Sequence, residues 1–253
     1  MRLIATALAF AAYVGWGTLP TLVAAQTQSE DGIVWGCEGV GYSLPTTEYA
    51  HGVLGDDVEY KGLHLLIDTS TGSLPATFEL PAGQVYEDIA PRCGDLNGNG
   101  ENEIVTVVSD ATGGARVVIY SKKTGPIDET PPIGRGYRWL APIAIADVDG
   151  DGQNDISYVE TPHLGGTLRV WTLKDGKLTQ IAEKRGFSNH RIGEDFITGG
   201  ARDCGDGTEL IVPDFDWNAL LAVRWQGGTL VQRSIANTTD LDTVQAALDC
   251  KLK

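Results

Sequence analysis

The chain has 253 residues and a formal net charge of −15, from 34 acidic and 19 basic side chains. This acidic balance argues against binding to nucleic acid or to an anionic membrane surface. The length is enough for one sizeable domain with a hydrophobic core, and the four Cys fit disulfides formed in an oxidising compartment.

The N-terminus resembles a secretory signal peptide. Arg2 is followed by an apolar run over residues 3–14, and the small residues at 23–25 offer a cleavage site. The run is too short to span a membrane, and a buried N-terminal helix is the alternative. Removal of residues 1–25 leaves 18 basic and 34 acidic side chains, a charge of −16. We expect a soluble monomer in the periplasm or outside the cell, with no membrane insertion.

Two apolar motifs recur about every 50 residues along the rest of the chain. Strand-like runs rich in β-branched and aromatic residues, each followed by a polar turn, lie at residues 62–67, 115–120, 167–171 and 220–225. A second motif leads into each unit, at residues 31–37, 88–93, 139–145 and 195–201. Together they divide the mature chain, residues 26–253, into four units near residues 31–84, 85–136, 137–190 and 191–235.

Units of about 50 residues with about four short strands are typical of propeller blades. We therefore predict an all-β fold, a β-propeller of four blades with about four antiparallel strands each. A five-bladed ring with one blade unrecognised and a Greek-key sandwich are the alternatives. Residues 239–249 have apolar side chains at 241, 244 and 248 behind Thr239 or Asp240 as a cap. This pattern predicts a short C-terminal helix packed on the ring.

Two loops, 52 residues apart, space oxygen-bearing side chains in the same way. Each has acids or amides at loop positions 1, 3, 5 and 9 and Gly at position 6. This spacing suits Ca²⁺, which takes six to eight oxygen ligands. The predicted ligands are the side chains of Asp95, Asn97, Asn99 and Glu103 with the Glu101 carbonyl, and the side chains of Asp147, Asp149, Asp151 and Asp155 with the Gln153 carbonyl.

The residues after the loops argue against an EF-hand. That motif needs Glu at position 12 on an exiting helix, whereas Thr106 and Tyr158 stand there and β-branched residues follow. We therefore expect strand–loop–strand turns and two Ca²⁺ ions, the second loop binding more tightly through its four carboxylates. Solvated acidic turns are the alternative, since Asp, Asn and Gly favour turns in any case.

The repeated loop before a strand resembles the FG-GAP/VCBS calcium repeats of integrin α-chain propellers and of many bacterial exported proteins. The whole mature chain looks like the short exported VCBS repeat-containing proteins of α-proteobacteria, most clearly over residues 163–171, 189–193 and 202–204. The resemblance implies calcium and a propeller, but it does not specify function. Only two loops are complete, because residues 203–209 are two residues short of the pattern.

The four Cys allow three disulfide pairings. Cys37 and Cys93 occupy equivalent first strands of adjacent units, which are neighbours around a propeller axis. We favour a Cys37–Cys93 bond, with a Cys204–Cys250 bond that ties the tail to the ring. A zinc site is the rival, although no C-x-x-C spacing supports it.

Polar residues gather on the face that we expect opposite the calcium loops. His51 precedes a longer loop in the first unit. The candidate ligand-binding residues are Asp88, Arg138, Trp139, His163, His190, Arg191 and Asp195. They suit a sugar acid or a peptide terminus, with Arg138 or Arg191 holding a carboxylate and with Trp139 and Trp217 stacking on a sugar. The alternative is that these charges pair internally and Trp139 packs in the core.

Three functions remain open. The first is a non-catalytic binding module for a protein, peptide or carbohydrate, in which calcium is structural. The second is a hydrolase or lyase acting on an acidic or sugar substrate, for which no catalytic motif is identifiable and no catalytic residue is assigned. The third is a structural or assembly propeller that contacts its partner through a blade edge or face. Function must be argued from a site and not from the fold.

Overall fold

The computed structural model describes residues 32–37 and 39–252. The predicted signal peptide, residues 1–25, lies outside them. Within the described residues no helix has the length and apolar character needed to cross a bilayer.

Seventeen described strands fall into four units, followed by one helix. The first unit holds β1 (Val34–Cys37), β2 (Val40–Thr46), β3 (Glu59–Thr69) and β4 (Gly72–Glu79). The second holds β5 (Gln84–Tyr86), β6 (Arg92–Gly94), β7 (Glu103–Asp110), β8 (Gly114–Ser121) and β9 (Gly125–Glu129). The third holds β10 (Leu140–Ala146), β11 (Asp155–Glu160), β12 (Thr167–Lys174) and β13 (Lys177–Arg185). The fourth holds β14 (Gly200–Asp203), β15 (Thr208–Pro213), β16 (Leu220–Gln226) and β17 (Thr229–Ala236), and the helix is α1 (Leu241–Leu248).

The predicted all-β architecture of antiparallel four-stranded blades with a short C-terminal helix is confirmed. The third and fourth units are separate sheets with the strand orders β10-β11-β12-β13 and β14-β15-β16-β17. The first two units are joined into one nine-stranded sheet, because β5 pairs with both β3 and β7. This link was not predicted, since β5 has only three residues.

The core is built between successive units. The second-unit strand β7 is buried on both faces, so its side chains alternate between two clusters. Val105 and Val107 pack towards Ile156 of the third unit. Ile104 and Val108 pack in the cluster of the first unit. A third cluster joins the third and fourth units. Each sheet therefore buries apolar surface against its neighbours in the chain, as stacked repeats do.

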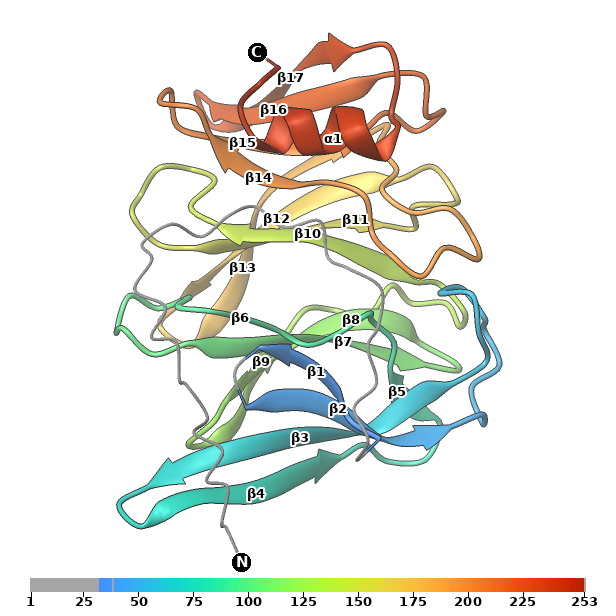
Figure 1. The fold of residues 1–253 in the computed structure, drawn as a ribbon, viewed down its shortest axis with the longest axis vertical. Coiled ribbons are helices and arrows are strands. Elements are labelled where there is room, and N and C mark those ends of the chain that lie inside the picture. The colour runs from blue at the N-terminus through green and yellow to red at the C-terminus, as the bar shows by residue number, and fades with distance from the viewer. Residues whose placement is uncertain (1–31, 38, 253) are drawn as a thin grey trace, which may run out of the picture.

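Helix α1 covers the outer face of the last sheet. Val244, Ala247 and Leu248 pack on Ile211 and Ala222 of that sheet. Asp240 is the N-cap, and its side chain accepts a hydrogen bond from Thr243 N at 2.9 Å. The helix thus caps the terminal repeat, while Figure 1 shows the first unit at the opposite end of the long axis.

The β2–β3 loop connects the first unit to the fourth. Gly193 N, in the segment that leads to β14, donates to Val53 O at 3.1 Å. Figure 1 shows this loop on one edge of the stack, at the right of the view, and the β6–β7 and β10–β11 loops on the opposite edge. The predicted disulfides are both present: Cys37–Cys93 joins the first two units and Cys204–Cys250 ties the end of α1 to the β14–β15 loop.

Candidate functional site

The β10–β11 loop brings three carboxylates together at its turn. Oxygens of Asp147, Asp149 and Asp151 lie within 4.8 Å of one another. The turn holds them there, because Asp147 accepts hydrogen bonds from Gly150 N at 2.7 Å and from Gly152 N at 3.0 Å. Like charges at this spacing repel each other unless a cation lies between them.

Asp155 completes the loop from the first residue of β11. Its Oδ2 accepts a hydrogen bond from Val148 N at 3.0 Å, whereas its Oδ1 is buried and has no hydrogen-bond partner among the described residues. Burial raises the pKa of Asp155 from 3.8 to about 6, and the charge of Asp149 adds to this. A buried carboxylate oxygen without a partner is costly unless a cation binds it. The donor set and this orphaned atom fit Ca²⁺.

The β6–β7 loop has the same turn but a different hydrogen-bond pattern. Asp95 accepts hydrogen bonds from Gly98 N and Gly100 N, each at 2.8 Å, which lower its pKa. The Glu103 carboxylate already has two partners, Leu96 N at 2.8 Å and Asn97 Nδ2 at 2.6 Å. Calcium would have to displace the Asn97 amide, which itself is a predicted ligand. The first loop therefore fits calcium less well than the second.

A side chain of the second loop reaches the first loop. Asn154 Nδ2 donates to the main-chain carbonyl of Asp95 at 2.9 Å. Asn102 holds the equivalent position of the first loop, and its side chain is exposed. The two predicted calcium loops therefore share a hydrogen bond that the sequence repeat alone does not reveal.

In the fourth unit, arginine side chains pair with the acid that ends the loop. Glu209, on β15, stands where Glu103 and Asp155 stand in the complete loops, and it accepts hydrogen bonds from Arg202 Nε and Nη2 at 3.1 and 2.7 Å. Arg233 also pairs with Glu209 at 2.8 Å. Burial favours the protonated carboxyl, but the hydrogen bonds from the two arginines outweigh it and lower the pKa of Glu209.

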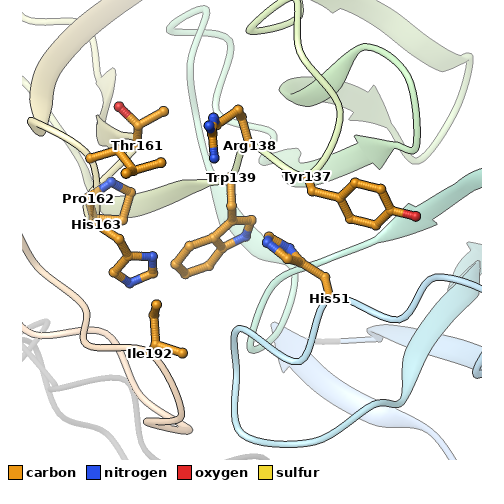
Figure 2. A pocket seen from close by; sticks show the side chains of 9 residues that line it. His51, Tyr137, Arg138, Trp139, Thr161, Pro162, His163 and Ile192 are labelled. Atoms are coloured by element: carbon orange, nitrogen blue, oxygen red, sulfur yellow. The ribbon is translucent and has the colours of Figure 1, made fainter.

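A pocket of about 190 Å³ (Figure 2) lies on the edge of the stack that carries the β2–β3 loop, opposite the β6–β7 and β10–β11 loops (Figure 1). It is lined by three units: the β2–β3 loop, the segment before β10 with the β11–β12 loop, and the segment before β14. Its rim is apolar and exposed, with Tyr137, Leu164 and Ile192 at 48%, 57% and 73% exposure. The lining residues are His51, Tyr137, Arg138, Trp139, Thr161, Pro162, His163, Leu164 and Ile192.

A chain of hydrogen bonds fixes the protons of two histidines. His190 Nε2 lies 2.9 Å from the Glu194 carbonyl, which can only accept, so Nε2 carries the proton. Burial lowers the pKa of His190 and lowers that of His163 to about 4, so both rings are neutral at pH 7. His190 Nδ1 is therefore an acceptor for His163 Nε2–H at 3.0 Å. This leaves the lone pair of His163 on Nδ1.

His51 is held by a buried carboxylate. Its Nδ1 lies 2.5 Å from Oε1 of Glu87, whose side chain is fully buried, while the His51 side chain is 19% exposed. Ser109 Oγ donates to the other oxygen of Glu87, and Trp139 Nε1 donates to the Glu87 carbonyl at 2.8 Å. Burial, and after it the charge of Glu87, raise the pKa of the neighbouring Glu59 from 4.5 to about 10, so Glu59 is protonated at pH 7.

The structure places three of the seven candidate residues, Arg138, Trp139 and His163, in the pocket. His190 is buried behind His163, and the Trp139 indole is only 2% exposed, against the stacking role expected for it. Asp88 is buried and pairs with Arg92. The remaining two, Arg191 and Asp195, are exposed and do not line the pocket; Arg191 lies over the Trp217 ring at 3.8 Å.

The other residues of the pocket were not predicted from the sequence. His51 was noted only as preceding a long loop, and Tyr137, Leu164 and Ile192 carry no motif. A signal that could have found the rim is the presence of large apolar side chains in segments otherwise rich in Gly and charged residues.

Comparison with known proteins identifies the repeat. Residues 95–158, which hold both calcium-type loops, match the family model of the FG-GAP-like repeat. A search of the curated proteins gives no match. Among solved structures, the chain is similar to the crystal structure of the exotype rhamnogalacturonan lyase YesX, at 15% identity and a TM-score of 0.41, over 88% of this chain and 53% of that chain. The chain thus spans about half the length of that lyase.

Proposed function

We propose, from the premise that the chain is an FG-GAP repeat protein, that it is an exported binding module in which two calcium ions are structural and a small polar ligand occupies the pocket. Its mechanism has two separate parts. The calcium loops stabilise one edge of the stack, and the opposite edge recognises the ligand. No step of chemistry is assigned to the metal.

The observation that carries the calcium part is the second loop. It combines three carboxylates within 4.8 Å and a buried Asp155 oxygen without a partner among the described residues. Asp147, Asp149, Asp151 and Asp155 would hold the ion, with the Gln153 carbonyl as a further ligand. When bound, the ion supplies positive charge that neutralises the repulsion and completes the turn.

Export is supported by covalent structure. Two disulfides in one chain are typical of an oxidising compartment. The apolar run and the small residues at 23–25 supply the signal for secretion or for transfer to the periplasm.

The binding part rests on the pocket. Arg138 lines it and has no ion-pair partner among the described residues, so its guanidinium is available to a carboxylate of the ligand. Proteins and peptides offer such a group at their C-termini and acidic side chains, and carbohydrates offer one where they contain a sugar acid. The volume of about 190 Å³ is below the range of about 300–1,000 Å³ that is usual for drug-sized ligands, which favours a small molecule or the end of a longer chain.

Calorimetric titration of the chelated protein with calcium tests the first part. We expect two sites, the tighter one lost in Asp149→Ala. Unchanged titration curves for that variant would refute the proposed loop. For the second part, Arg138→Met should abolish the binding of a carboxylate ligand without changing the melting temperature.

A further inference from the structure

The His51–Glu87 pair lies outside the predicted ligand set and outside the calcium loops. His51 comes from the β2–β3 loop, which extends from the first unit to the fourth. Its Nδ1 is hydrogen-bonded to Oε1 of the Glu87 carboxylate at 2.5 Å. Figure 2 shows its ring directed towards Trp139 across the pocket, from the side opposite His163.

The tautomer of His51 follows from this bond. Glu87 Oε2 accepts a hydrogen bond from the Ser109 hydroxyl, and Glu87 Oε1 faces His51 Nδ1. A carboxylate only accepts, so Nδ1 of His51 carries the proton. When the ring carries this single proton, its lone pair is on Nε2, which has no hydrogen-bond partner among the residues that the structure describes.

The loop that carries His51 is fixed in place. Tyr49 stacks on Tyr137 with ring centroids 5.2 Å apart, and Val53 O accepts the hydrogen bond from Gly193 N. Val53 and Leu54 are buried in the cluster shared with the third unit. His51 is therefore preorganised, and a ligand does not have to order the loop in order to meet it.

The pocket thus presents two imidazole acceptors, His51 Nε2 and His163 Nδ1, with Arg138 as a cation and Leu164 and Ile192 as apolar rim. The two imidazole acceptors match hydroxyl or amine donors on a ligand. The guanidinium of Arg138 matches an anionic group, and the apolar rim matches an apolar face of the ligand. One small ring with hydroxyls, a carboxylate and C–H faces satisfies all three.

We infer that the pocket binds a sugar acid, with His51 as the acceptor for one ligand hydroxyl and Glu87 as the positioning residue that keeps the His51 lone pair on Nε2. This inference rests on the proposed function, because it names the ligand class of the same pocket. It adds a residue pair that decides hydroxyl recognition.

The tautomer is measured first, without any ligand. Long-range ¹H–¹⁵N spectra of the calcium-loaded protein assign the protonated nitrogen of each of the four histidines. We expect the proton on Nδ1 of His51 and on Nε2 of His163. A proton on Nε2 of His51 overturns the inference, because the ring would then donate into the pocket.

Binding is measured next, by shifts of the pocket resonances with three probes: D-glucuronate, D-glucose and propionate. Glucose lacks the carboxylate and propionate lacks the hydroxyls. We expect glucuronate to bind most tightly. If none of the three shifts the resonances, the sugar-acid inference is overturned and so is the pocket part of the proposed function.

Two variants separate His51 from Arg138. In Glu87→Gln the new side-chain amide can donate an N–H to His51 Nδ1, which moves the ring proton to Nε2. The affinity for glucuronate should then fall between about threefold and tenfold, while the affinity for propionate stays unchanged. His51→Gln gives a second reading if Glu87→Gln fails to fold. His64→Gln, at a half-buried histidine on β3 that does not line the pocket, is the matched control and should change nothing. If glucuronate binding is lost in Arg138→Met but unchanged in His51→Gln, the inference about His51 is overturned. The proposal that the pocket binds a carboxylate ligand would then still hold.

Discussion

Replacement of Asp155 by Asn should stabilise the calcium-free protein and remove most of its response to calcium. Asp155 is 1% exposed, and one of its oxygens has no partner among the described residues. Burial raises its pKa from 3.8 to about 6, so keeping it ionised at pH 7 costs the folded state up to about 3 kcal/mol. Asn fills the same volume, carries no charge and can still accept the Val148 N–H.

Calcium reverses the order of stability. At free calcium a hundredfold above Kd, binding stabilises the wild-type protein by about 2.7 kcal/mol. The Asn variant lacks the charged ligand and should lose most of this increment. Urea unfolding at pH 7, in chelator and in calcium, gives the four free energies of unfolding. Glu103→Gln is the control in the first loop, where the carboxylate already has two partners, and it should gain less in chelator.

The pH dependence has a defined sign. Because the folded-state pKa of Asp155 is raised above its unfolded value, ionisation of this group destabilises the protein. In chelator, stability should therefore rise as the pH falls from about 6 to about 4, and the Asn variant should lack that rise. The proposed cost of ionising Asp155 would be refuted if Asp155→Asn were less stable than wild type in chelator and its free energy of unfolding changed with pH in the same way between about 6 and 4.

The other predictions concern contacts between units. Asn154→Ala should weaken calcium binding at the first loop and lower the free energy of unfolding by about 1 kcal/mol. Asn102→Ala, at the exposed residue in the equivalent position, should do neither, as measured by calorimetry and melting curves. Arg202→Met should destabilise by about 3 kcal/mol in urea unfolding, since its side chain is 1% exposed and pairs with Glu209; a loss below about 1 kcal/mol would contradict this. Gly55→Ala should loosen the β2–β3 loop in hydrogen exchange, because its φ is +97° and a Cβ would lie 2.8 Å from Gly193 O.

The calcium-type loops could be predicted from the sequence because their ligands lie within nine consecutive residues. A tight turn brings positions 1, 3, 5 and 9 together whatever the rest of the chain does. The strands were predictable for a similar reason, since the β-branched runs at β7 and β8 alternate between two buried faces. The disulfide pairing followed from the repeat, which placed Cys37 and Cys93 at equivalent positions.

The pairing of Glu209 with arginines in the fourth unit could be seen only in the structure. The shortened loop indicated a missing ion, but Arg202 and Glu209 are seven residues apart, and Arg233 arrives from β17. Burial likewise decided the roles of Asp88 and Trp139. Both were candidates because they lie on segments that enter the first strands of their units, yet Asp88 pairs with Arg92 and Trp139 donates its indole N–H to Glu87 O.

The sequence by itself determined the repeat, the strands, the metal-type loops and the cysteine pairs, because each depends on short or regularly repeated spacings. Only the tertiary structure decided the pocket. His51, Arg138, His163 and Ile192 come from three units and meet because the β2–β3 loop extends from the first unit to the segment before β14. The path of a loop over its neighbours is set by packing of side chains such as Val53 and Leu54, and no local pattern encodes it.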